Sequence, residues 1–184
     1  QPQVDARTCR ITGVEALLRW KDETGHPVSS AEFIPVMEEN GMIIPVGMWV
    51  IRTALEAGRL WVKEDPLFTV SVNVSALQIL EEDFTAVLKQ TVEEKEFPYQ
   101  NLIIELTESC MAKNLCMFEE RFEELRALGI RVAICHDAGI KVCLEGVETA
   151  VEYEFLKERD LDSFQGYYFG RPVPENEIVL QKLV

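Results

Sequence analysis

The chain has 184 residues, is 47% hydrophobic and carries a net charge of −14 from 18 basic and 32 acidic side chains. This length and hydrophobic content suffice for one domain with its own core. The negative charge excludes binding of polymeric nucleic acid or of an anionic membrane surface by general attraction, and leaves an anionic ligand only local binding through metal ions or a placed arginine.

Periodicity divides the chain into alternating short strands and helices. This alternation, with short apolar strands, indicates an α/β fold with a parallel sheet. The predicted strands cover residues 1–6, 13–20, 68–74, 102–106, 130–134 and 140–144. The predicted helices cover residues 29–41, 46–63, 75–92, 117–128 and 151–159, with a final helix from 174, and residues 21–28 form a loop. Expected core positions of the second helix are Trp49, Ile51, Leu55 and Trp61.

Cysteine and histidine content predicts the cellular setting. Five cysteines without a CxxC pair indicate free thiols in a reducing cytoplasm, and two histidines are too few for a His-rich zinc site. The sequence has no apolar run of about eighteen residues, so we expect no transmembrane helix, and no signal-peptide pattern is visible. Because the chain opens within a strand-like pattern, QPQVD, we expect a fragment of a longer protein.

Polar side chains occur at the carboxyl ends of several predicted strands. In a (β/α) barrel these ends open on one face, where active sites lie. A doubly wound open sheet is the alternative, but its glycine-rich phosphate loop is absent after the first strand. The residues concerned are Asn73, Glu105, Glu145 and Gln165.

Glu15 lies inside an apolar strand pattern, where a carboxylate is costly unless it is paired or bound to a metal. Arg19, four residues later, would share its face of the strand, so one interpretation is an internal ion pair. The other interpretation is a site of oxygen ligands, which suits Mg²⁺, Mn²⁺ or Ca²⁺. Paired divalent ions suit phosphodiester hydrolysis, so the residues predict metal-assisted phosphoryl chemistry.

Five blocks occur in the order GVEALLRW, SVNVS, IIELTES, LEGVET and QGYYFGRP. Together they resemble the EAL-domain family of bacterial cyclic di-GMP phosphodiesterases, over nearly the whole chain. The resemblance implies a single domain over 1–184 with a clipped N-terminal strand, folded as a modified TIM (β/α)₈ barrel. It implies hydrolysis of cyclic di-GMP to linear pGpG in cytoplasmic signal transduction. It also implies a homodimer and a flanking sensor or GGDEF-type domain.

The same resemblance assigns the metal site. Glu15, Asn73, Glu105 and Glu145 match ligands of Mg²⁺ or Mn²⁺, with two ions in the complete site. Glu15 and Glu145 match catalytic residues, and a metal-bound water would attack one phosphodiester. Asn73 has a simpler interpretation as the cap of the helix that follows it.

Substrate contacts are implied in the same way. Arg19 would contact a phosphate and Gln1 a guanine base, while Glu148 and Gln165 would line the site. Gln165 has the alternative of an ordinary buried amide. Glu108 would hold the loop after its strand, near where these domains pair.

Two blocks of the family are absent. Members carry a DDFGTGYSSL-type block after the strand that matches 131–134, and then an LKID-type strand with a catalytic lysine. Here Ile134 runs directly into CHDAGIKVCLEGVET. A (β/α)₈ barrel has about 250 residues, and removal of an internal strand exposes two edges. We therefore expect an omitted or deleted segment between Ile134 and Cys135, and the enzyme assignment assumes that the natural chain contains it.

Three alternatives stay open. Asp137 is a remnant of the first absent block in a competing alignment. The domain is a catalytically inactive receptor for cyclic di-GMP, or a protein-interaction module. A different Mg²⁺-dependent barrel enzyme, acting on a small phosphorylated metabolite, is the third.

Overall fold

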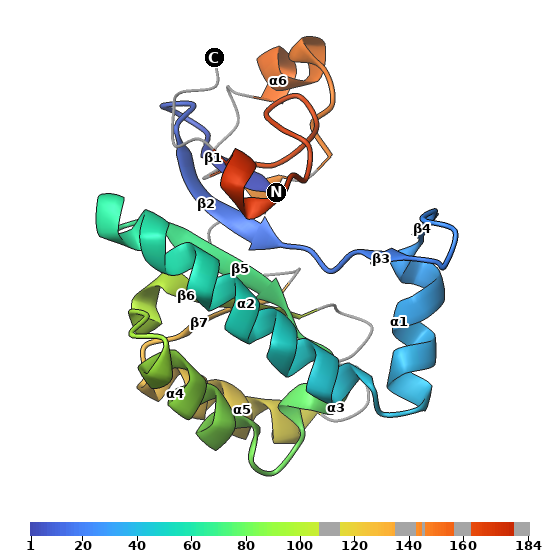
Figure 1. Cartoon of the computed structure of the whole chain (residues 1–184). Helices are drawn as coiled ribbons and strands as arrows, with labels where there is room; N and C mark the ends of the chain where they lie inside the picture. Colours follow the sequence, from blue (N-terminus) through green and yellow to red (C-terminus); the bar gives the residue numbers. More distant parts are fainter. Residues whose placement is uncertain (107–114, 135–142, 145, 157–162, 179–184) are drawn as a thin grey trace.

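The main sheet of the computed structural model has seven strands in the order β7-β6-β5-β2-β1-β9-β8 (Figure 1). The structure describes residues 1–106, 115–134, 143–144, 146–156 and 163–178. The strands are β1 (Pro2–Asp5), β2 (Ile11–Ala16), β5 (Thr69–Asn73), β6 (Leu102–Leu106), β7 (Arg131–Ile134), β8 (Cys143–Leu144) and β9 (Ser163–Phe164). A separate two-stranded sheet pairs β3 (Trp20–Lys21) with β4 (Pro27–Val28).

The longest helix, α2 (Ile43–Glu64), packs against β5, and α5 (Leu115–Ala127) packs against β7. The helix α1 and the β3–β4 hairpin stand away from this body, on the right of Figure 1, whereas α6 lies at the top of that view, beyond β1. The other helices are α1 (Ser30–Glu39), α3 (Ala76–Ile79), α4 (Phe84–Glu94), α6 (Ala150–Leu156) and the 3₁₀ helices η1 (Tyr99–Asn101) and η3 (Glu175–Glu177).

Strand direction places three carboxyl ends together. β2, β5 and β6 are neighbours in the sheet and run parallel, with Glu15 opposite Ser71 and Asn73 opposite Glu105. β1 is antiparallel to both β2 and β9, so β9 runs in the same direction as β2. Polar residues at the ends of β2, β5, β6 and β9 therefore lie at one end of the curled sheet.

The sheet is open in the part of the chain that the structure describes, and its two edges are β7 and β8. These strands flank the junction between Ile134 and Cys135, where the sequence predicts a missing strand. One further strand between them would supply the eighth member of a closed barrel. Cys135 itself lies outside the described residues.

The main core fills the space between the sheet and its helices. Val70, Val72, Leu102 and Ile104 are 0 to 1% exposed. Buried and half-buried residues alternate along β6, whereas in β5 Ser71, between the two valines, is also buried. On α2 the buried residues recur at helical spacing, through Gly47, Ile51, Ala54, Leu55, Gly58 and Val62. A second apolar cluster contains Val4, Ala6, Val147, Tyr153, Phe164 and Phe169.

The predicted strand over 13–20 is wrong at its end. β2 stops at Ala16, which is opposite Val72, because its partner β5 ends one residue later at Asn73. The predicted loop over 21–28 contains the β3–β4 hairpin, in whose turn Asp22 N donates to the His26 carbonyl and His26 N donates to Asp22 Oδ1, each at 2.9 Å. Arg19 therefore lies beyond the sheet.

Three helix predictions also need correction. The predicted helix over 75–92 is two helices, α3 and α4, because acidic residues 81–83 follow α3 and Asp83 is the residue that precedes the first turn of α4. α2 begins at Ile43, which places Pro45 inside its first turn, where proline is tolerated. After Pro174 the structure has the 3₁₀ helix η3, and residues 179–184 lie outside the described part.

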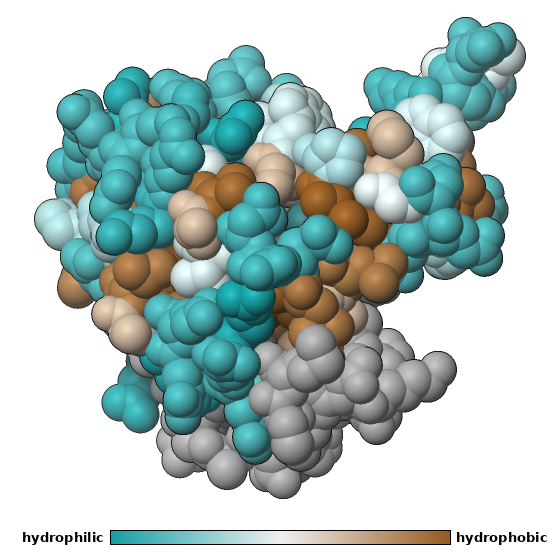
Figure 2. Space-filling model, turned by 90° about the horizontal axis from the view of Figure 1, so that it is seen from below, coloured by the Kyte–Doolittle hydropathy of each residue, from teal (hydrophilic) through white to brown (hydrophobic). Residues whose placement is uncertain are grey.

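Trp49 is not a core residue, since 58% of it is exposed, whereas Ile51 and Leu55 are fully buried as predicted. Trp49 is off the buried face of α2. Trp61 is half-buried and packs beside the core against Phe68, with ring centroids 5.6 Å apart. Exposed apolar side chains interrupt the hydrophilic surface of the face drawn in Figure 2.

No helix in the described ranges has both the length and the apolar character needed to cross a bilayer.

Candidate functional site

Glu15 is the centre of the site. It lies near the carboxyl end of β2, is 9% exposed and uses both carboxylate oxygens. Asn73 Nδ2 donates to Oε1 at 2.5 Å, and Gln165 Nε2 donates to Oε2 at 2.5 Å. Three residues from β2, β5 and the segment after β9 are thus brought together, and two amide donors stabilise the buried carboxylate.

Glu105 is next to Asn73. The two residues are opposite each other in the parallel pair β5 and β6, and the Glu105 carbonyl accepts from Val74 N at 3.0 Å. Glu105 is half-buried. Side chains directly opposite on neighbouring strands face the same side of the sheet. Glu15, Asn73 and Glu105 therefore form a row of oxygen-bearing side chains across three strands.

Gln1 borders this row through the main chain. Its nitrogen donates to the Glu15 carbonyl at 2.6 Å, and Glu15 N donates to the Gln1 carbonyl at 2.8 Å. Its side chain accepts from Gln165 Nε2 at 3.4 Å and donates to the Gly170 carbonyl at 3.2 Å. The two glutamines and Glu15 form one hydrogen-bonded group.

Arg19 is not the partner of Glu15. It is exposed, and its Nη1 donates to the Leu18 carbonyl at 3.2 Å. The ion pair with Glu15 required both residues on one straight strand, and β2 ends three residues before Arg19. The internal ion pair is therefore wrong for this structure, and the guanidinium stays accessible to an anionic ligand.

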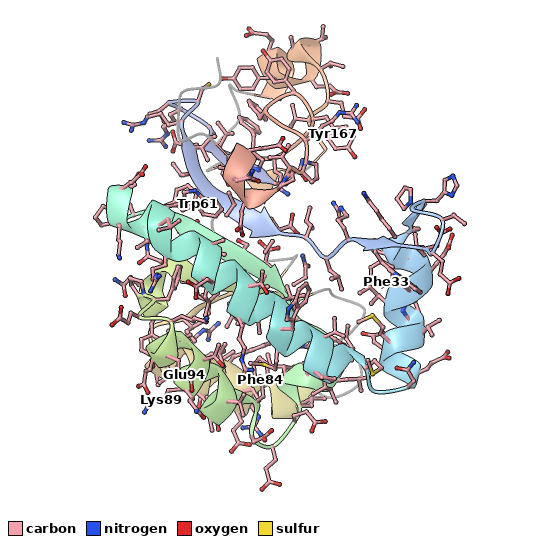
Figure 3. All side chains as sticks on the ribbon, in the orientation of Figure 1. Phe33, Trp61, Phe84, Lys89, Glu94 and Tyr167 are labelled. Carbon is pink, nitrogen blue, oxygen red and sulfur yellow. The ribbon has the colours of Figure 1, made fainter. Side chains whose placement is uncertain are left out.

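Two cavities flank the segment 16–19. One, of about 410 Å³, also contacts Gln1, Glu15, Trp61 and the segment 172–175. The other, of about 470 Å³, lies between α1, α2 and the end of β5, and its lining includes Asn73. In Figure 3, Trp61 on α2 marks the first cavity and Phe33 on α1 marks the second. Arg19 lines both cavities.

The remaining predicted residues are Glu145, Glu108 and Glu148. Glu145 and Glu108 lie outside the described residues. Glu148 is exposed, and its main-chain nitrogen donates to Glu152 Oε2 at 2.8 Å. The roles of Glu145, Glu108 and Glu148 stay predictions from the sequence.

The donor set fits a hard divalent cation. It consists of carboxylate and amide oxygens, which Mg²⁺ and Mn²⁺ prefer. Among the described residues Gln165 Oε1 is buried without a hydrogen-bond partner, as expected of an oxygen that a cation or water would satisfy. In that same part of the chain, no three His, Cys, Asp or Glu side chains are grouped closely enough to hold an ion. A complete ion site would therefore also need Asn73 as a ligand and Glu145, which lies outside the described residues.

Ser75, Glu38 and Gln78 were missed by the sequence prediction. Ser75 Oγ donates to Glu38 Oε1 at 2.5 Å, and Gln78 Oε1 accepts from Ser75 N at 3.1 Å. All three line the second cavity. The signal in the sequence was the S-x-x-Q spacing of a capping box at the start of α3.

The model of the EAL domain family matches residues 1–135 and 132–172, so the chain belongs to that family. The two matches meet at 132–135, where the sequence predicts the missing segment. The predicted family assignment is confirmed.

Solved structures of the family have the same fold. The PaMucR phosphodiesterase in its c-di-GMP complex superposes with a TM-score of 0.90 at 25% identity, covering 97% of this chain and 92% of that one. The EAL enzyme Bd1971, in a form bound to cAMP and cyclic di-GMP, gives 0.86 at 25% identity, covering 96% of this chain and 61% of that one. The predicted fold class, an EAL-type modified TIM barrel, is thereby confirmed.

Curated relatives are longer. Signaling protein YkoW of Bacillus subtilis is 29% identical over 224 residues, which cover 96% of this chain and 28% of that protein. Cyclic di-GMP phosphodiesterase PdeR of Escherichia coli is 26% identical, with coverage of 95% and 33%. The chain thus spans about a third or less of each. Since 96% of 184 residues is about 177, the alignment with YkoW has about 47 positions without a counterpart here.

Proposed function

We propose that this chain is the EAL module of a larger bacterial signalling protein and hydrolyses cyclic di-GMP to linear pGpG with Mg²⁺ or Mn²⁺. The observation that carries the proposal is the convergence of Asn73 and Gln165 on the buried Glu15 carboxylate, beside Glu105. Family membership and the c-di-GMP complexes among the similar structures support the same substrate.

Different residues are proposed to bind the metal ions and the phosphates of the diester. Glu15, Asn73 and Glu105 are proposed to hold divalent ions together with Glu145, and these ions would neutralise the phosphate and activate water. The amide of Gln165 keeps the Glu15 carboxylate in place. Arg19, exposed between two cavities, is proposed to bind a phosphate of the ring through its fork of N–H donors.

Gln1 lines the first cavity and carries the proposed contact to one guanine. Glu148 is proposed to line the complete site, and Glu108 to hold the loop after β6. We further propose a cytoplasmic setting, pairing as a homodimer, and a flanking sensor or GGDEF-type domain. The short span of the chain within its relatives supports the last point, since MucR of Pseudomonas aeruginosa, 26% identical, is a bifunctional diguanylate cyclase and cyclic di-GMP phosphodiesterase.

A receptor without turnover is the second candidate function. The sequence supports it, since the two blocks that would supply two aspartates and the lysine are absent between Ile134 and Cys135. Binding needs fewer groups than hydrolysis, because catalysis depends on interactions made only in the transition state.

One assay separates the two functions. The purified protein is incubated with cyclic di-GMP and Mn²⁺ or Mg²⁺, and pGpG is followed by liquid chromatography, while calorimetry measures binding in Ca²⁺. The proposal expects metal-dependent pGpG formation that chelation abolishes. Binding without product selects the receptor. Neither binding nor product would overturn both.

A further inference from the structure

The chain that leaves the sheet after β2 forms a lobe of its own, residues 17–41, which contains β3, β4 and α1 and stands away from the body in Figure 1. The lobe has internal packing, because Trp20 contacts Phe33 edge-on, with ring centroids 5.7 Å apart and ring planes at 83°. Phe33 is 3% exposed. The hairpin and the helix therefore share a small core that keeps the lobe together as one unit.

The first connection between the lobe and the body is loosely packed. In the part of the chain that the structure describes, residues 17–19 form no main-chain hydrogen bond with another segment. Leu18 and Arg19 line three cavities, of about 410, 470 and 590 Å³. Protein interiors rarely contain voids larger than a water molecule, so few close neighbours hold this segment in place. Low local packing marks the parts of a protein that open most readily.

The second connection is the turn between α1 and α2. Gly41 in this turn has a φ of +76°, and a Cβ at this position would have no atom within 4 Å. Glycine tolerates the changes in φ and ψ that a hinge requires, and the space around it leaves them unopposed. Both connections of the lobe to the body thus have the properties of hinges.

One side-chain contact holds the lobe against the body. Glu38 Oε1, on α1, accepts from Ser75 Oγ at 2.5 Å. Ser75 is buried and precedes α3, whose first turn it caps by accepting from Leu77 N at 3.3 Å. Among the described residues, this is the only hydrogen bond between a side chain of the lobe and a side chain of the body. A hydrogen bond to a carboxylate is stronger than one between neutral groups, so this contact suits a latch.

We propose that the lobe is a hinged lid facing the carboxyl ends of β2 and β5, and that the hydrogen bond between Glu38 and Ser75 latches it closed. Arg19 lies in the first hinge, so opening of the lid moves its guanidinium relative to this end of the sheet. Because the lid turns as a unit about two short connections, it opens without unfolding of the sheet.

Thiol labelling measures this opening. Ile43 is 5% exposed and lines the cavity of about 470 Å³ between α1 and α2. In Ile43→Cys, N-ethylmaleimide should react at this position only when the lid opens, and mass spectrometry of each peptide separates this reaction from those of the native cysteines. Leu88→Cys is the matched control, since Leu88 is fully buried on α4, outside the lobe, and becomes accessible only on global unfolding.

Position 43 should react at least about tenfold faster than position 88, because a local opening costs less free energy than global unfolding. Low concentrations of urea should accelerate labelling at 88 much more than at 43, since sensitivity to urea grows with the surface that an opening exposes. Equal rates with equal dependence on urea would show that the lobe opens only with the whole domain and would overturn the lid. If melting shows that Ile43→Cys is not folded, Val46→Cys, which lines the same cavity, replaces it.

Substitutions at Glu38 test the latch in the Ile43→Cys chain. Glu38→Ala should accelerate labelling at position 43 roughly 10-fold to 100-fold, the effect of losing one hydrogen bond to a charged group. Glu38→Gln keeps an acceptor for Ser75 Oγ, so its labelling rate should lie between those of the parent and of Glu38→Ala. Glu39→Ala, at the next and exposed position of α1, is the control and should label like the parent. Parental labelling in folded Glu38→Ala would refute the latch.

Cyclic di-GMP extends the test to the site around Glu15, and this arm alone rests on the proposed function. A ligand that binds only while the lid holds Arg19 in place stabilises the closed lid. In Ca²⁺, cyclic di-GMP at about 100 times its Kd should therefore slow labelling at position 43 about 100-fold. Binding in the calorimeter without slower labelling would refute the coupling of Arg19 to the lid. Absence of binding would refute the proposed function, and labelling without ligand would still decide the lid.

Discussion

The amide of Gln165 donates a 2.5 Å hydrogen bond to the carboxylate of Glu15, 150 residues earlier in the chain. Glu15 is on β2 and Gln165 follows β9, with β1 between the two strands in the sheet. Neighbouring strands are about 4.8 Å apart, so long side chains on a curled sheet bridge two strand spacings. The contact joins the parallel half of the sheet to its other half and stabilises a buried charge.

Gln165→Leu should lower the free energy of unfolding by about 1–3 kcal/mol, because it leaves one oxygen of Glu15 without its donor. Urea denaturation at pH 7 measures the change. Gln90→Leu is the control, since Gln90 is exposed and bonds only to Glu94 among the described contacts. It should change stability by less than about 0.5 kcal/mol. Equal effects would show that the contact with Glu15 adds nothing.

Asn73→Ala should reduce Mn²⁺-dependent pGpG formation at least about 100-fold, because it removes a proposed ligand and a donor to Glu15. The cost to folding should stay near 1 kcal/mol, since Asn73 is exposed and loses one hydrogen bond. Calorimetry with Mn²⁺ gives a readout that does not depend on turnover. Parental Mn²⁺ affinity and full activity in this variant would disprove the ligand assignment.

Gly166→Ala should lower the free energy of unfolding by about 3 kcal/mol or more. A Cβ at this position would lie 2.0 Å from the Val147 carbonyl oxygen, which is main chain and cannot rotate away. Gly170→Ala is the matched control, because its Cβ would meet only the Pro2 side chain, 3.0 Å from Cγ and 3.5 Å from Cδ. Thermal or urea denaturation should therefore show a larger loss of stability for Gly166→Ala than for Gly170→Ala. Similar losses would contradict the close packing of Gly166 against the Val147 main chain.

Tyr153→Phe should make the chain less sensitive to alkali. A hydrogen bond with the Cys9 thiol at 2.8 Å, with burial adding to it, raises the pKa of Tyr153 to about 12. Above pH 10 the unfolded chain loses the phenolic proton more readily than the folded chain, so this group stabilises below pH 10 and the contribution disappears as pH rises towards 12.

Urea denaturation between pH 9 and roughly pH 11.5 tests this point, using the reference tyrosine pKa of about 10. The decline in stability with pH should be shallower in Tyr153→Phe than in the parent. Tyr167→Phe, at an exposed position, should follow the parent. A parental slope in Tyr153→Phe would show that the Cys9 contact does not hold the proton.

Sequence patterns determined much of the fold, because they report local preference and burial. β5, β6 and β7 lie within a residue or two of the predicted ranges, and α2 within three, since continuous apolar runs and helical periodicity mark buried elements. A missing strand was also predicted from the sequence. The open edges β7 and β8 and the two-part family match agree with it.

Only part of the site could be predicted from sequence patterns. Glu15, Asn73 and Gln165 were predicted as one group from their strand ends, and the structure brings them together. Glu38 and Gln78 were missed because each has an ordinary local reading, one on an amphipathic helix and one in a capping box. Only the packing of α1 and α3 around one cavity relates them.

By itself the sequence determined the order of elements, the family and the set of oxygen-bearing side chains. Tertiary structure decided where β2 ends, since a strand continues only while its neighbour supplies hydrogen bonds, and β5 stops at Asn73. It therefore decided that Arg19 leaves the sheet and that amides, rather than a guanidinium, satisfy Glu15. Contacts of this kind depend on strands distant in sequence, which local preference does not encode.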